Sequence, residues 1–237
     1  MGKPGAKPRR LQDPSWSAEV AYACGLMATD GCLLPNGRHL NLTSNDLDQL
    51  ETFKKCLNLK ANISWKKSGY TGRMNSQIQF GDVVLHKWFR SIGLTPNKTK
   101  TIGKLNIPDE YFFDYLRGEF DGDGSSHAYW DTRWRSSVSL YLKFTCASAP
   151  HLEWLNDSIF KFLAVKGYIQ QAGGVYALTF SKQKAKVLYK AMYYSTKIPF
   201  LKRKKDKLDR QWVAAKLAHE EKRSPLLVRS GSILRIA

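Results

Sequence analysis

The residues best suited to chemistry in this chain are two aspartates that occupy equivalent places in a repeated motif. Residues 23–31 and 116–124 each contain a glycine, four further residues and a closing Asp-Gly pair, which is typical of a helix end. A carboxylate there faces the negative end of the helix dipole, and two such acids side by side would also repel each other. Since Mg²⁺ is bound by a few carboxylates completed by water and phosphate, we expect Asp30 and Asp123 to be catalytic and metal-binding.

Similarity between the two parts of the chain continues beyond these motifs. Equivalent residues are Thr43 and Thr145, Leu50 and Leu152, Glu51 and Glu153 (offset 102), and Phe80 and Phe180 (offset 100). The two motif aspartates are offset by 93, so the second half contains about nine extra residues, most simply near residues 127–134. We therefore predict a basic arm (1–14), two related halves (15–105 and 106–205) and a basic helical extension with a tail (206–237).

A basic turn follows the last predicted helix of each half. These turns are residues 94–98 and 200–204, and they contain Lys98 and Lys204. A lysine near a metal-bound phosphate can stabilise developing negative charge or help to orient the attacking water, so both are candidate catalytic residues. Plain phosphate binding or solvent exposure is the alternative role. The neighbours Lys100, Lys202 and Arg203 are alternative choices for these positions.

Hydrophobic periodicity predicts the same order of elements twice. The first half has a helix capped by Ser15 or Ser17, a hairpin turning at residues 35–37, a helix from Asp46, strands at 61–67 and 76–80, and a helix from Asp82. The second half has the motif helix, a long strand pair, a helix at 150–165, strands at 168–171 and 175–180, and a helix from Lys182.

Polar side chains alternate with apolar ones along several of these strands, most clearly in residues 133–145. For a single strand, an ordinary solvated face would explain this pattern. Because Arg, Lys, Gln, Asn and Ser recur with few carboxylates, we instead expect a sheet that lies in the major groove of DNA. The candidate DNA-binding residues are Arg38, His39, Asn41, Thr43, Lys66, Arg73, Gln77, Gln79, Arg133, Arg135, Ser137, Ser139, Tyr141 and Lys143.

Composition favours an intracellular protein with a polyanionic partner. The chain has 237 residues with 38 Lys and Arg against 20 Asp and Glu, a net charge of +18. No apolar run approaches the length of a membrane span, and the basic N-terminus lacks the apolar stretch of a secretory signal. The four cysteines form no C-x-x-C pair, which is expected of buried thiols in a reducing compartment.

Over residues 16–210 the chain resembles a single-chain LAGLIDADG homing endonuclease. Residues 116–124 match the family motif closely, whereas the first motif has Ala28 in place of the first aspartate. The metal-binding acid of the family is the second aspartate, which is matched here by Asp30 and Asp123. The resemblance implies an α+β fold of two pseudo-twofold related αββαββα halves, whose four-stranded antiparallel sheets form a DNA-binding saddle. It also places Ser44 and Cys146 at positions that support the two sites.

The resemblance further implies a monomeric, metal-dependent DNA endonuclease. Such an enzyme hydrolyses both strands of a long, asymmetric, double-stranded DNA target with Mg²⁺ and leaves short 3′ overhangs. Two sheets that each follow one helical turn predict a target of roughly 20 base pairs. The gene would be intron-encoded or free-standing. Two alternatives within the same fold are a group I intron maturase, with intron RNA as its partner, and a non-catalytic DNA-binding regulator. Retention of Asp30 and Asp123 weighs against the regulator.

Overall fold

The two halves expected from the repeat contain the same order of helices and strands. The computed structural model describes residues 14–67, 72–130 and 138–223. The first half consists of α1 (Ala18–Thr29), β1 (Gly31–Leu33), β2 (His39–Ser44), α2 (Leu47–Cys56), β3 (Ile63–Lys67), β4 (Met74–Gly81), α3 (Val83–Ser91) and the short 3₁₀ helix η1 (Lys98–Lys100). The second consists of η2 (Asp109–Tyr111), α4 (Phe112–Asp123), β5 (Ser125–Trp130), β6 (Val138–Cys146), α5 (Ala149–Leu163), β7 (Tyr168–Ala172), β8 (Val175–Ser181), α6 (Lys182–Met192) and α7 (Lys202–Arg223).

Each half builds a four-stranded antiparallel sheet. The strand orders are β1-β2-β4-β3 and β5-β6-β8-β7, so the second sheet repeats the first. In the registers, Leu42 lies opposite Ile78 and Leu142 lies opposite Phe180. All four are fully buried, because the apolar positions of a period-two strand share one face. The predicted α+β class with duplicated halves is confirmed.

Local sequence signals explain where two helices of the first half begin. Of the two candidate caps for α1, the structure selects Ser17, whose hydroxyl accepts a hydrogen bond from the backbone N–H of Val20 at 3.2 Å. Asp82 caps α3 in the same way and accepts from the N–H of Leu85 at 2.9 Å. These caps fix the direction in which each helix leaves the preceding segment.

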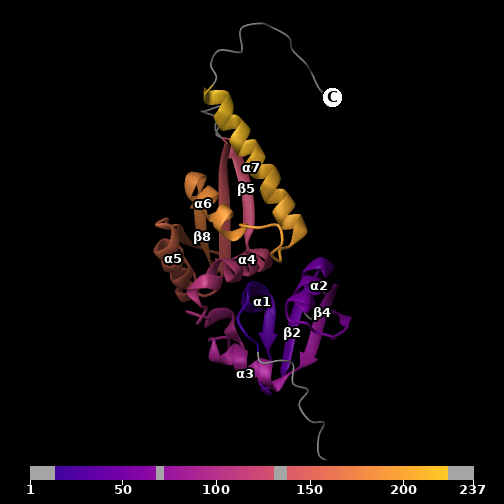
Figure 1. Ribbon diagram of the computed structural model, residues 1–237. Coiled ribbons are helices and arrows are strands. Elements are labelled where there is room, and N and C mark those ends of the chain that lie inside the picture. The colour runs from indigo at the N-terminus through magenta and orange to yellow at the C-terminus, as the bar shows by residue number, and fades with distance from the viewer. Residues whose placement is uncertain (1–13, 68–71, 131–137, 224–237) are drawn as a thin grey trace, which may run out of the picture.

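Helices α1 and α4, which carry the two motifs, meet at the junction of the halves (Figure 1). Glycines allow this close approach: a Cβ at Gly25 would lie 2.2 Å from the carbonyl oxygen of Tyr115, and one at Gly122 would lie 2.0 Å from the hydroxyl of Thr29. Any larger side chain would have to push the helices apart. The motif glycines therefore bring the two helix ends, and the acids on them, close together.

The last helix, α7, runs along β5 and β6 of the second sheet (Figure 1). It begins at Lys202, so the predicted boundary at residue 205 falls inside this helix. Its Leu208 is fully buried in the main core, and the ring of Trp212 stacks on Tyr189 of α6 at 4.9 Å. The first turns of α7 are therefore part of the second half.

Several predicted features lie outside the described residues. They are most of the N-terminal arm, the tail after Arg223, part of the turn before Arg73 and the start of the long strand, including Arg133, Arg135 and Ser137. Among the helices that are described, none combines the length and hydrophobicity needed to cross a lipid bilayer.

Candidate active site at the junction of the two halves

The paired helix ends place Asp30 and Asp123 within electrostatic range of each other. Asp30 is the C-terminal cap of α1, and Asp123 is the last residue of α4. Burial, together with the negative charges of Asp30 and Glu119, raises the pKa of Asp123 to about 6, although the positive charges of Lys204 and Lys98 oppose this shift. Burial also raises the pKa of Asp30, although a hydrogen bond from Gln49 opposes this. Burial and mutual repulsion disfavour the negative charge of both carboxylates, and a cation bound between them would stabilise that charge.

Lys98 and Lys204 occupy equivalent places at these helix ends. The ammonium group of Lys98 donates to the carbonyl oxygens of Gly31 at 2.6 Å and Thr29 at 3.4 Å. That of Lys204 donates to the carbonyl oxygens of Phe120, Gly122 and Gly124 at 2.7–2.8 Å. Burial lowers the pKa of both, that of Lys204 to about 8.

The two alternative lysines near them in sequence lie away from these helix ends. Lys202 forms an exposed ion pair with Asp206 at 2.6 Å, and Lys100 is exposed. Of the residues considered from the sequence, the structure therefore brings together Asp30, Asp123, Lys98 and Lys204, and it also places the alternative residue Arg203 beside Asp30.

Gln49 is a residue of the site that sequence reasoning missed. Its side-chain N–H donates to Oδ2 of Asp30 at 2.9 Å, and its carbonyl oxygen accepts from the hydroxyl of Ser44 at 2.7 Å. Gln49 is only 2% exposed, so the two hydrogen bonds from Ser44 to Gln49 and from Gln49 to Asp30 hold the Asp30 carboxylate in a fixed orientation. Ser44, which the resemblance places at a supporting position, is thus linked to Asp30 through Gln49. The available sequence signal for Gln49 was an amide residue next to Leu50, on the side of the predicted helix that carries its apolar residues.

The equivalent positions in the second half are arranged differently. The constant offset of 102 places Cys146 at the position of Ser44 and His151 at the position of Gln49. His151 faces Glu119 with Nε2 at 2.7 Å and donates from Nδ1 to the carbonyl oxygen of Gly103 at 2.7 Å, so it turns away from Asp123. Within the described part of the chain, no side chain donates a hydrogen bond to Asp123. The two acids therefore have different surroundings.

A polar cavity of about 360 Å³ opens beside Asp30. It is lined by Asp30, Thr43, Ser44, Asn45, Asp46, Gln49, Asn75, Gly122 and Arg203, so α1, β2, α2, β4, α4 and α7 all contribute. Gly122 belongs to the second motif, and Arg203 comes from the start of α7. Both halves thus build the walls of this one cavity.

Polar candidates on the first sheet share the face opposite the core. Register pairs Asn41 with Gln79, Thr43 with Gln77 and Lys66 with Asn75. Gln79 and Lys66 are exposed, as are Arg38 and Arg73 beside the sheet. Gln77 is only 9% exposed and accepts a hydrogen bond from Asn41 at 2.9 Å, so it braces its neighbour. His39, at the start of β2, bonds Asn36 through its ring.

The second sheet presents a more aromatic face. The rings of Tyr141 and His127 stack at 4.7 Å, and Lys143 lies opposite Ser125. Ser139 lies opposite Tyr129 and is only 6% exposed. The polar faces of the two sheets therefore differ in chemistry.

The donor set at the junction fits a hard divalent cation that shares its ligands with water and phosphate. Among the described residues, no group of three His, Cys, Asp or Glu side chains could hold a metal alone. Asp30 and Asp123 supply two carboxylates, and Mg²⁺ is commonly bound by one or two carboxylates together with substrate phosphates and waters. The residues present thus fit a divalent cation such as Mg²⁺ whose remaining ligands are water and phosphate.

Comparison with solved structures shows what the architecture is. The LAGLIDADG meganuclease I-AabMI bound to uncleaved DNA has a TM-score of 0.60 at 15% identity over 84% of this chain and 91% of that one. The K262A mutant of I-SmaMI has a TM-score of 0.58 at 14% identity over 86% of this chain and 94% of that one. Full-length DUF199/WhiA from Thermatoga maritima has a TM-score of 0.53 at 16% identity over 84% of this chain. The match spans only 62% of the length of that protein.

No family model and no characterised protein matches the chain in sequence. The similarity to solved structures shows that the chain has the fold shared by LAGLIDADG meganucleases and the DUF199/WhiA protein.

Proposed function

We propose that this protein is a site-specific DNA endonuclease of the LAGLIDADG type. The observation that supports this most strongly is the pair Asp30 and Asp123 at the junction of two four-stranded sheets, with Lys98 and Lys204 at the same helix ends. A purely binding protein gains nothing from two carboxylates whose burial and mutual repulsion oppose their ionisation.

In this proposal the residues at the junction divide the work. Asp30 and Asp123 would hold Mg²⁺, and the bound ion would supply Lewis-acid stabilisation of charge on the phosphate. Gln49 fixes the orientation of Asp30. Lys98 and Lys204 stabilise negative charge that develops during hydrolysis, because preorganised donors in a partly buried site act strongly. Each strand is cut near one acid, leaving short 3′ overhangs.

The sheets provide the recognition surface. A net charge of +18 favours a polyanion, and the exposed amide and cationic groups on the first sheet suit base edges and phosphates. The second sheet, with its stacked His127 and Tyr141, differs from the first, so the target of roughly 20 base pairs is asymmetric. The structurally similar meganuclease I-AabMI was solved bound to uncleaved DNA, which supports DNA as the partner in this proposal.

A non-catalytic binding protein of the same fold is the second candidate. It is favoured by one observation, the difference between the two acids, since Asp123 lacks the amide that holds Asp30. The N-terminal LAGLIDADG domain of DUF199/WhiA also shares the fold, with a TM-score of 0.52. A maturase that binds intron RNA would likewise explain the basic character.

Selection of cleaved sites from a randomised duplex library in Mg²⁺ tests the proposal. The endonuclease predicts recovery of one long asymmetric site with short 3′ overhangs, and no recovery when EDTA replaces Mg²⁺. Tight sequence-specific binding without cutting would favour the binding protein. Absence of both would direct the next test to intron RNA.

A further inference from the structure

Pseudo-twofold related positions at the two proposed centres differ in polarity. The acids and the lysines match, since Lys98 and Lys204 make the same kind of contact. Three pairs around them do not match: Ser44 and Cys146, Asp46 and Ser148, and Gln49 and His151. The Asp30 centre has the more polar member in the first two pairs, and in the third only Gln49 reaches its acid.

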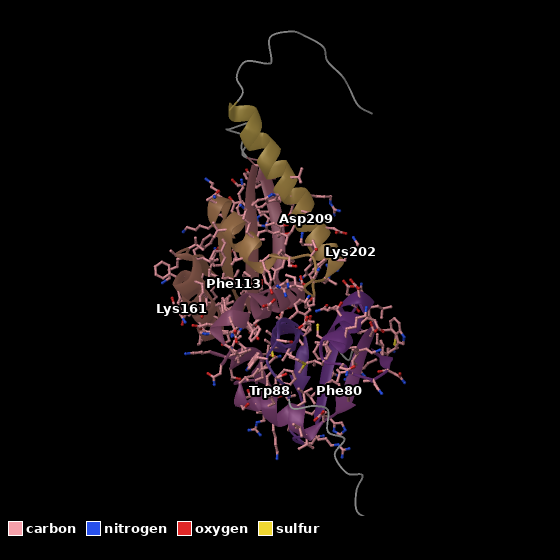
Figure 2. All side chains as sticks on the ribbon, in the orientation of Figure 1. Phe80, Trp88, Phe113, Lys161, Lys202 and Asp209 are labelled. Carbon is pink, nitrogen blue, oxygen red and sulfur yellow. The ribbon has the colours of Figure 1, made fainter. Side chains whose placement is uncertain are left out.

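Arg203 adds a fourth difference. It stands immediately before Lys204, and the equivalent residue before Lys98 is Asn97, which is neutral and exposed. The Arg203 guanidinium forms an ion pair through Nε with Asp46, the cap residue of α2, and thereby crosses from the second half to the first. The start of α7 lies at the junction of the halves, where Figure 2 labels the adjacent Lys202.

The position of Arg203 directs its charge to one centre. Its side chain is 63% exposed, yet it lines the polar cavity together with Asp30 and Gly122. The ion pair with Asp46 involves Nε, and a guanidinium has further N–H donors that suit phosphate oxygens.

We propose that Arg203 is a phosphate-binding residue of the Asp30 centre and that the two centres are consequently unequal. The strand engaged beside Asp30 is cut first, and a nicked duplex accumulates before the second strand is cut. The order of cutting rests on the proposed endonuclease function, but the contact between Arg203 and a DNA phosphate does not.

The first test follows each strand separately. A duplex recovered by the selection above is labelled on one strand or the other and cut by wild type, Arg203→Ala and Lys202→Ala. Lys202→Ala is the matched control, because it removes the same charge from an adjacent side chain that is 72% exposed. We expect wild type to cut one strand faster. Arg203→Ala should slow that strand by roughly tenfold or more, the effect of one charge-assisted hydrogen bond, and leave the other strand unchanged.

The second test uses binding without metal. In EDTA, Arg203→Ala should weaken binding of the same duplex and reduce the salt slope of log Kd by about one, whereas Lys202→Ala should change it less. Replacing the phosphate cut beside Asp30 by a neutral methylphosphonate should remove the difference between wild type and Arg203→Ala. Arg203→Lys, which keeps the charge, should bind better than Arg203→Ala.

The outcomes separate this inference from the proposed function. Equal cutting of both strands by wild type, or equal effects of the two substitutions, would overturn the inference while leaving the endonuclease intact. If wild type cuts no DNA, the order of cutting is refuted. In that case a duplex selected for binding, with methylphosphonates placed in turn across its central steps, decides whether Arg203 contacts a phosphate. An affinity difference that persists at every step would refute the contact.

Discussion

Gly118 faces Gly25 across the α1–α4 interface so closely that a Cβ on Gly118 would lie 3.0 Å from the Cα of Gly25. The same Cβ would lie 2.1 Å from the carbonyl oxygen of Tyr22, a backbone atom that cannot move away alone. The spacing of the two helices, and with it the placement of Asp30 and Asp123, therefore depends on the absence of side chains at this contact.

Gly118→Ala should consequently destabilise the protein. We expect the free energy of unfolding to fall by roughly 1–3 kcal/mol or more, because the added methyl group must push one helix away from the other. Urea unfolding followed by circular dichroism measures this. Gly103→Ala is the matched control, since nothing lies within 4 Å of its added Cβ, and it should change stability by about 0.5 kcal/mol or less. Equal effects of the two substitutions would show that the interface is not tightly packed.

Lys204→Met should slow cleavage of DNA. The ammonium group holds three carbonyl oxygens at the end of α4, and in the proposed mechanism it also stabilises charge on the phosphate. We expect the cleavage rate of the selected duplex to fall by on the order of 100-fold. Lys202→Met removes the same charge from an exposed position and should reduce the rate far less. A Lys204→Met protein that cuts as fast as this control would remove Lys204 from the catalytic residues.

The ion pair of His151 and Glu119 predicts a pH-dependent stability. Burial opposes the imidazolium, but the Glu119 carboxylate at 2.7 Å and the carbonyl oxygen of Gly103 raise the pKa of His151 above its usual value. Folding therefore favours protonated His151. Its stabilisation is complete below the ordinary pKa of about 6.5 and is lost as the pH rises through the higher folded-state value.

His151→Gln tests this pH dependence of stability. Glutamine is chosen because the equivalent residue of the first half is Gln49. At pH 6 the substitution should lower the free energy of unfolding by roughly 3–5 kcal/mol, because it removes the imidazolium that pairs with the buried Glu119 carboxylate. At pH 9 the difference from wild type should be clearly smaller. Parallel urea titrations at the two pH values measure it, and a difference that stays constant or grows with pH would contradict the protonated pair.

Two exposed residues of the first sheet should affect DNA recognition in different ways. Gln79→Ala should relax the preference at one base pair and cost about 1–3 kcal/mol at the preferred base, since an amide can read a base edge. Lys66→Ala should weaken binding equally for all sequences and reduce the salt slope by about one. Binding titrations against single-position variants of the selected target distinguish the two effects. Loss of base preference in Lys66→Ala, with none in Gln79→Ala, would reverse these roles.

Much of this architecture could be predicted from the sequence because the signals are local or repeated. The glycines and aspartates of the two motifs define α1 and α4, and the drifting offset defines the halves. Period-two alternation identified the core face of the strands, such as Leu40 and Leu42 on β2. The basic segments at residues 94–98 and 200–204 indicated Lys98 and Lys204, although residues 202–204 form the first turn of α7 and not the predicted turn after the last helix.

The remaining features depend on contacts between distant segments. Gln49 bonds Asp30 across 19 residues, and Arg203 pairs with Asp46 across 157. Periodicity within α2 shows that Gln49 falls on a buried face but not which group it meets. Residues 202–204, the first turn of α7, contain three cations, and only the fold directs Arg203 to the cavity, Lys204 to the end of α4 and Lys202 to solvent.

Cleavage of the selected duplex by Asp30→Asn and Asp123→Asn tests the central claim most directly. Both variants keep the size of the side chain but remove the charge that would hold Mg²⁺. We predict that neither variant makes a double-strand break, while both bind the duplex in EDTA with affinities within a fewfold of wild type. Double-strand cleavage at the wild-type rate by either variant would contradict the assignment of these aspartates as the catalytic, metal-binding pair.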